Sequence, residues 1–222
     1  MSKPNEIKPF SLRVKEDLDK LHIKPESIIQ NIEEDIPPWT YRYPDVDLTI
    51  SSLKKSLNTP EIYMEIFLKC IEKHKDYTKL YTDGSKDGSK VGCAVFEKQF
   101  SAKLRLPNNA SIFTAEAKAI DLALSYISQH NKDKFAIFSD SLSVLTSLKN
   151  RSTNNILIKN LILRFHNILS TKSIKLIWIP SHVGICGNET VDSLAKESLK
   201  SQPINLKSPS TDFKPSINTF IS

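Results

Sequence analysis

Glycine is scarce in this chain, with only 5 among 222 residues. Loops that bind nucleotide phosphates or dinucleotides depend on closely spaced glycines, so this composition leaves almost no room for them. The sequence also lacks the Gly-x-Ser-x-Gly turn that carries the serine nucleophile of many hydrolases. Residues 83–88 begin like a calcium-binding loop, but the twelfth position is Ala94, where a bidentate Glu is required. The chemistry therefore has to be sought among other residue types.

Cysteines and long apolar runs are also limited. The three cysteines, Cys70, Cys93 and Cys186, are odd in number and have no zinc-binding spacing with His166 or His182. No apolar run approaches the length of a membrane span, and the first residues lack the apolar core of a secretory signal. We therefore expect an intracellular protein in a reducing compartment, with no membrane partner and with neither cytoplasm nor nucleus favoured.

The hydrophobic fraction of 39% is that of a globular protein, and the formal net charge of +6 is distributed unevenly. Residues 1–58 carry 9 basic and 10 acidic side chains, whereas residues 59–222 carry the other 22 basic and 15 acidic ones. A basic surface suits a protein that approaches a polyanion such as nucleic acid. An ordinary lysine-rich soluble surface explains the same numbers, so charge alone does not decide between the two.

Hydrophobic periodicity predicts a core of alternating elements. A meander of three strands comes first, and two strands that are apolar on both faces then alternate with helices. Strands are expected at residues 78–82, 91–97, 101–106, 135–139 and 174–179, and helices at 59–75, 111–129, 141–149, 155–170 and 188–200. This order predicts an α/β fold with a mixed sheet that has helices on both faces.

The core is expected to form one domain with an extension at each end. We expect residues 76–200 to be this domain, residues 1–75 to be a leader or joining region with one helix, and residues 201–222 to be a mobile tail. A short helix or two is expected between Val14 and Ile36, interrupted by Pro25. Some apolar leader residues could dock on the domain, with disorder as the alternative; they are Ile36, Trp39, Tyr41, Val46, Leu48 and Ile50.

Two of the predicted strands end in an aspartate. Asp83 follows the strand at 78–82 and precedes a turn expected at 84–88, and Asp140 follows the strand at 135–139. In sheets of this class, sites form beyond the carboxyl ends of the parallel strands. Both carboxylates are therefore expected at one edge of the sheet.

Two further carboxylates lie on predicted helices. Glu116 borders the apolar stripe of its helix, where an unpaired charge is costly. Asp192 lies in the first turns of a helix that Asn188 is expected to cap. Each carboxylate alone has an ordinary structural explanation, but four at one sheet edge indicate a divalent metal site. Two hard cations such as Mg²⁺, about 4 Å apart, can hold the attacking water and the leaving oxygen of a phosphodiester.

Five stretches of the sequence resemble type 1 ribonuclease H domains in order and spacing. The run from His182 to Asp192 is highly specific, whereas Asp83-Gly84-Ser85 alone is not, and the likeness covers roughly residues 76–200. The stretches are Thr82-Asp83-Gly84-Ser85, Phe113-Thr114-Ala115-Glu116, Ser139-Asp140-Ser141, Trp178-Ile179-Pro180-Ser181-His182-Val183-Gly184, and Gly187-Asn188-Glu189 with Asp192.

The resemblance implies a ribonuclease H-like, five-stranded mixed sheet. It also implies endonucleolytic cleavage of the RNA strand of RNA–DNA hybrids, with two Mg²⁺ ions as cofactor and Mn²⁺ as a possible substitute. Asp83, Glu116, Asp140 and Asp192 match the metal-binding carboxylates of the family. His182 matches a loop histidine thought to shuttle a proton or to assist product release, work that suits an imidazole.

The same motifs, with Pro37-Pro38-Trp39 upstream, are similar to the C-terminal end of non-LTR retrotransposon polyproteins. This resemblance implies a reverse transcriptase domain as a partner, in addition to the RNA–DNA hybrid. One departure is that only residues 149–155 join two helices where some family members carry an extra basic helix for gripping the hybrid. Two alternatives stay open: a nucleic-acid-binding remnant that no longer cuts, and a transposase or integrase of related fold, which usually lacks this histidine loop.

Overall fold

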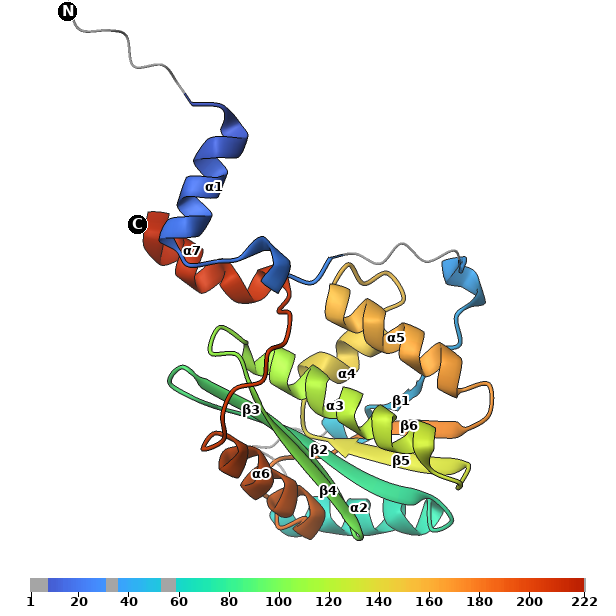
Figure 1. Ribbon diagram of the computed structural model, residues 1–222. Coiled ribbons are helices and arrows are strands. Elements are labelled where there is room, and N and C mark those ends of the chain that lie inside the picture. The colour runs from blue at the N-terminus through green and yellow to red at the C-terminus, as the bar shows by residue number, and fades with distance from the viewer. Residues whose placement is uncertain (1–7, 31–35, 53–58, 222) are drawn as a thin grey trace, which may run out of the picture.

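The sheet has six strands of mixed direction in the computed structural model, which describes residues 8–30, 36–52 and 59–221 (Figure 1). Its strand order is β1-β6-β5-β2-β3-β4. The first four strands in this order are parallel to one another, whereas β3 and β4 form an antiparallel meander with β2. The strands are β1 (Asp45–Asp47), β2 (Thr78–Asp87), β3 (Lys90–Glu97), β4 (Phe100–Leu106), β5 (Lys134–Ser139) and β6 (Ser173–Trp178).

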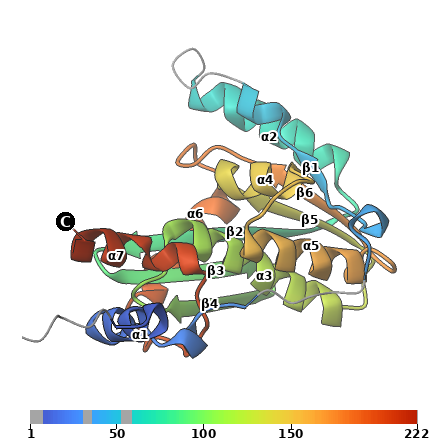
Figure 2. The same ribbon diagram turned by 90° about the horizontal axis from the view of Figure 1, so that it is seen from above.

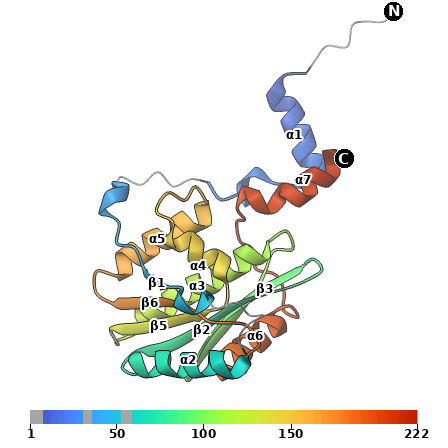
Figure 3. The same ribbon diagram turned by 180° about the vertical axis from the view of Figure 1, so that it is seen from behind.

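Helices cover both faces of the sheet, as the sequence predicts. Helices α3, α4 and α5 lie over one face, and α2 and α6 lie over the other (Figures 1 and 3). No helix in the described part of the chain is long and apolar enough to cross a bilayer. The helices are α1 (Phe10–Lys20), α2 (Pro60–Lys73), α3 (Ile112–Gln129), α4 (Leu142–Lys149), α5 (Ile156–Ile168), α6 (Cys186–Ser198) and α7 (Lys214–Ile221), with 3-10 turns at Pro25–Ser27, Pro38–Thr40, Thr49–Ser52 and Ser210–Phe213.

All five expected strands are present, and the leader adds a sixth. Strand β1 pairs with β6 over residues 175–177 and covers what would otherwise be an open edge of the sheet. The tryptophan of the leader does not dock with the others, since 85% of Trp39 is exposed. Of the leader residues expected to dock, Tyr41, Val46, Leu48 and Ile50 pack in the main core cluster.

Strand β2 is longer than expected, because Gly84 continues the strand instead of starting a turn. Asp83 pairs with Ala94 of β3, and Gly84 pairs with Cys93. The chain reverses after Asp87, at Gly88, whose φ of +56° lies in the left-handed region that glycine tolerates best. The prediction of a turn at 84–88 is therefore wrong for most of that range, and Asp83 lies within a strand.

The two extensions meet beyond one end of the sheet. Helices α1 and α7 lie close together in all three views (Figures 1, 2 and 3). Nζ of Lys20 lies 5.8 Å from the centre of the Phe220 ring. The helix expected between Val14 and Ile36 begins earlier, at Phe10, and ends before Pro25. Residues 31–35 of that expected range lie outside the described residues.

The C-terminal tail packs along the domain, which corrects the expectation of a mobile extension. The backbone N–H of Ile204 donates to the carbonyl of Arg105 in β4 at 2.9 Å. Ser208 forms a parallel bridge with Ile28 of the leader. Phe213 is only 8% exposed. Residues 201–213 are therefore a folded part of the molecule.

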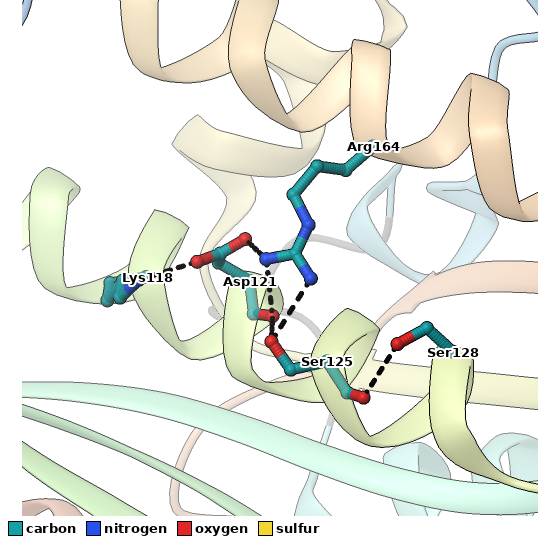
Figure 4. A network of polar contacts seen from close by, with 5 residues as sticks. All are labelled: Lys118, Asp121, Ser125, Ser128 and Arg164. Atoms are coloured by element: carbon teal, nitrogen blue, oxygen red, sulfur yellow. Dashed lines mark hydrogen bonds and ion pairs between the residues drawn. The ribbon is translucent and has the colours of Figure 1, made fainter.

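A polar network joins α3 to α5 (Figure 4). The carboxylate of Asp121 on α3 accepts hydrogen bonds from Arg164 of α5 and, at 2.6 Å, from Nζ of Lys118. Arg164 also donates to Oγ of Ser125, at 3.1 Å. The Asp121 carboxylate is thus the acceptor for two cationic side chains, and the network helps to fix α3, the helix that carries Glu116.

Candidate active site

Three carboxylates meet where β2 and β5 lie against the first turns of α3. Asp83 lies on β2, and Asp140 directly follows the neighbouring parallel strand β5. Glu116 comes from α3, whose N-cap residue Ser111 accepts a hydrogen bond from the backbone N–H of Thr114 at 3.1 Å. One ligand oxygen from each of the three carboxylates lies within 4.8 Å of the other two. The structure therefore brings three of the predicted site residues together.

Gly84 allows α3 to approach β2 this closely. A Cβ atom at residue 84 would lie 2.8 Å from the backbone nitrogen of Glu116 and 2.9 Å from Cβ of Ala115. Both distances are shorter than side chains tolerate, so any larger residue would push the start of α3 away from the strand. The glycine beside Asp83 therefore sets the distance between the Asp83 and Glu116 carboxylates.

Burial opposes the negative charge of all three carboxylates. Burial raises the pKa of Asp83 to about 7, and the charges of Asp140 and Asp192 act in the same direction. Burial also raises the pKa of Glu116 well above its ordinary value, with added repulsion from Asp83 and Asp140. The pKa of Asp140 is raised by burial as well, although a hydrogen bond from Asn188 offsets part of the effect. Without a cation, this site favours uptake of protons.

Asp192 and His182 belong to a second, adjoining group. Ligand atoms of His182, Glu189 and Asp192 lie within 4.8 Å of one another, with Nδ1 of His182 at 3.9 Å from the Glu189 carboxylate. Asp192 accepts a hydrogen bond from Nζ of Lys196 at 2.6 Å. It is not in the group of three, but its charge contributes to the raised pKa of both Asp83 and Asp140. The structure therefore divides the five predicted residues into two adjoining sets.

Asn188 is the residue whose place the sequence reasoning missed. The prediction that it caps a helix is wrong, because α6 begins at Cys186 with Ile185 as its N-cap. Asn188 is instead buried within the first turn and donates from Nδ2 to Oδ2 of Asp140 at 3.3 Å. The neighbouring Gly187 packs against Tyr81, whose ring would lie 2.3 Å from a Cβ at that position. The signal was present in the sequence, since Asn188 belongs to one of the five family-like stretches.

The RNase H family model matches residues 75–200, more than half of the chain. The chain belongs to the RNase H family. Ribonuclease H activity follows from this membership. A comparison with curated proteins finds no match.

Solved RNase H1 structures resemble this RNase H domain at low identity. The enzyme from the halophilic archaeon Halobacterium salinarum is 22% identical, with 55% of this chain and 97% of that chain covered and a TM-score of 0.44. LC11-RNase H1, solved in complex with an RNA/DNA hybrid, is 14% identical, with 55% and 95% covered and the same TM-score. The assignment depends on the family match, and these two structures add no further argument.

The three carboxylates of the RNase H domain fit a hard divalent cation. Oε2 of Glu116 is buried and has no hydrogen-bond partner, which is costly for a carboxylate unless a cation satisfies it. The donors are carboxylate oxygens, the ligands that Mg²⁺ and Mn²⁺ prefer. The repulsion among the three carboxylates also disappears when positive charge is added between them. The residues present therefore suit a divalent metal ion.

Proposed function

We propose that the RNase H domain hydrolyses the RNA strand of RNA–DNA hybrids at the carboxylate site. The observation that carries the proposal is the meeting of Asp83, Glu116 and Asp140, with one buried Glu116 oxygen left unpaired. A buried cluster of like charges is expensive for a fold to maintain, so it calls for a cationic ligand. In an RNase H domain, that ligand would act on a phosphodiester.

We propose that Asp83, Glu116, Asp140 and Asp192 hold two Mg²⁺ ions, for which Mn²⁺ can substitute. When bound, such ions lower the pKa of a water molecule and offset the charge that develops on the phosphate. Asn188 keeps the Asp140 carboxylate oriented through its hydrogen bond. Lys196, one turn further along α6, holds Asp192 by the same kind of contact. The protein residues thus bind and orient, and they supply little covalent chemistry.

His182 would move a proton at the leaving oxygen. Its side chain is 71% exposed, on a loop where φ of His182 is +57°, so it can reach a strand bound at the site. The carboxylate of Glu189 lies beside Nδ1 and can hold the ring when it is protonated. A general acid of this kind speeds the reaction without being indispensable to it.

A cleavage assay tests the proposal. The full chain is incubated with a labelled RNA–DNA hybrid in Mg²⁺, in Mn²⁺ and in EDTA, and the Asp83→Asn variant is the matched control. We expect cleavage of the RNA strand in either cation and none in EDTA. Binding without cleavage by the wild-type chain would favour the alternative, a non-cleaving remnant of a retrotransposon polyprotein. Cutting of plain double-stranded DNA would instead favour a transposase-like or integrase-like activity.

We also propose that the domain works beside a reverse transcriptase domain, as in non-LTR retrotransposon polyproteins, in the cytoplasm or nucleus. The order of the five motifs and the upstream Pro37-Pro38-Trp39 support this context. In that arrangement residues 1–75 join the two domains, residues 76–200 are the nuclease, and residues 201–222 form its tail. Co-expression with such a reverse transcriptase should raise hybrid cleavage, and the absence of any effect or association would contradict the proposed partner.

A further inference from the structure

The C-terminal tail reaches the helix that carries Glu116. After α6, Ile204 and Leu206 pack against the cluster that contains Leu106, Ala115 and Ala119. The tail then turns through Ser210–Phe213 and places Asp212 against the first turn of α3. These tail residues lie outside the range that the family model matches, which ends at residue 200. They are therefore a feature of this chain that family membership does not explain.

Asp212 makes a buried, charge-assisted hydrogen bond to α3. Asp212 is 5% exposed, and its Oδ2 accepts from Oγ1 of Thr114 at 2.7 Å. The Thr114 hydroxyl lies 3.0 Å from Oγ of the N-cap Ser111, whose side chain also accepts from the Thr114 backbone N–H. A negative charge at this point is favoured by the partial positive charge of the α3 N-terminus. The tail is thus bonded to the capping structure of α3.

The first turn of α3 is held from two sides. On one side, Gly84 lets the backbone at Glu116 lie directly on β2. On the other, the Asp212–Thr114 bond ties the turn to the tail, and the tail is itself joined to the leader by the bridge between Ser208 and Ile28. Thr114 and Glu116 are two positions apart, so they point to different sides of the helix. A shift of this turn would move the Glu116 carboxylate relative to Asp83 and Asp140.

We infer that Asp212 is a positioning residue of the nuclease site, which acts through Thr114 to fix the place of the Glu116 carboxylate. This inference rests on the proposed function. The tail residues touch neither substrate nor cation, and they set how well the three carboxylates fit a cation. Partners bonded directly to a metal ligand typically change metal affinity by about 10- to 100-fold when they are removed, and Asp212, which acts through Thr114, is expected at the lower end of that range.

The test removes the bond without leaving a buried polar group unpaired. In the double variant Thr114→Val with Asp212→Leu, both partners become apolar and keep the same branching and number of side-chain heavy atoms, a change that folds tolerate better than removal of one partner. Thr114→Ser, which keeps the hydroxyl, is the matched conservative variant. Circular dichroism and thermal unfolding of the full chain establish that each variant is folded.

Two readouts are measured on each variant. The first is Mn²⁺ binding, followed by electron paramagnetic resonance, and the second is the Mg²⁺ concentration that gives half-maximal hybrid cleavage. We expect the double variant to bind Mn²⁺ at least about 10-fold more weakly, to need correspondingly more Mg²⁺, and to recover most of its maximal rate at saturating Mg²⁺. The single variant Thr114→Ser, which keeps the hydroxyl, should behave like the wild-type chain in both measurements.

The outcomes separate this inference from the proposed function. A wild-type chain that does not cleave, while the double variant still loses Mn²⁺ affinity, would refute the nuclease proposal and support the positioning role. A folded double variant with wild-type Mn²⁺ affinity and Mg²⁺ dependence would overturn the positioning role. Faster cleavage by the double variant would overturn it as well, because the tail would then act as an obstruction.

Discussion

The carboxyl of Asp83 lies in surroundings that oppose its charge. Its pKa is raised from 3.8 to about 7, first by burial and then by Asp140 and Asp192. Between these two pH values the folded protein binds a proton that the unfolded chain releases. The free energy of unfolding should therefore fall as pH rises from about 4 to about 7 in the absence of divalent cations.

The Asp83→Asn variant tests this reasoning. Because asparagine has nearly the same volume and no charge, the variant should be more stable than wild type at pH 8 in EDTA, by up to roughly 4 kcal/mol, with little difference near pH 4. It should also lose both cleavage and most of the stabilisation by Mg²⁺. Urea unfolding at the two pH values, with EDTA or Mg²⁺, measures the two stability effects, and the hybrid cleavage assay measures the activity. A variant that cut at the wild-type rate would show that Asp83 is not a metal ligand.

His182 offers the contrasting case of an exposed site residue. Its replacement by alanine should leave the unfolding free energy unchanged within about 0.5 kcal/mol, because 71% of the side chain is exposed. Hybrid cleavage should slow by about 100-fold without stopping, as expected when a proton-transfer group is removed. Single-turnover rates over a range of pH measure the effect. An unchanged single-turnover rate would leave His182 without a role in proton transfer.

At the scale of elements, the close contact between β2 and α3 decides whether the site forms. Gly84 permits the contact, and Ser111 caps the helix at the point where it begins. The polar network of Asp121 and Arg164 fixes the other side of α3 against α5. Sequence periodicity places both elements correctly, but it contains nothing about how closely they approach.

Alanine substitutions at Gly84 and Gly88 distinguish the effect of close packing between β2 and α3 from the effect of a left-handed backbone conformation. Gly84→Ala should destabilise the fold by about 1–3 kcal/mol and weaken Mg²⁺ binding, because the added methyl group displaces the start of α3. Gly88→Ala should cost about 1–2 kcal/mol through its left-handed backbone but leave Mg²⁺ affinity intact, since no atom lies within 4 Å of the added Cβ. Denaturant unfolding and Mg²⁺ titration distinguish the two. Equal loss of Mg²⁺ affinity in both would contradict this account of Gly84.

At the scale of the whole molecule, the leader contributes a strand to the sheet, and the tail contributes a buried carboxylate to α3. Both lie outside residues 75–200, which the family model matches. The domain of this chain is therefore larger than its family-defined part.

Truncation of the leader tests this conclusion. A chain of residues 59–221 lacks β1 and leaves the β6 edge unpaired, so it should lose about 3 kcal/mol or more and aggregate more readily. Removal of residues 1–21 is the matched control, because no residue of α1 is buried. Thermal unfolding and light scattering compare the two truncations. Equal stability of the 59–221 chain and the full chain would show that β1 is dispensable.

Much of the fold could be predicted from the sequence, because the signals are local. Period-two and period-3.6 patterns of apolar residues gave five strands and the core helices to within a few residues, except that β2 runs on to Asp87. The candidate carboxylates Asp83 and Asp140 were found because each directly follows an apolar run of strand residues. Glu116 and Asp192 were found on predicted helices, and the family-like motifs added His182; the catalytic roles of all these residues stay predictions.

The features that the sequence did not reveal all depend on contacts between distant residues. Val46, Leu48 and Ile50 alternate with polar residues, but Asp45–Asp47 forms a strand only by pairing with the edge of β6, a contact between distant residues. The local sequence predicts a turn at Gly84 and a helix cap at Asn188. Only the tertiary structure shows that Gly84 packs against α3 and that Asn188 bonds Asp140. Asp212 and Thr114 are 98 positions apart, and no local pattern links them. The sequence by itself determined the helices and strands and the chemistry of this protein, because both depend on patterns of residues that lie close together in the chain. The tertiary structure alone decided which side chains support the site, because that depends on how the packed elements meet in space.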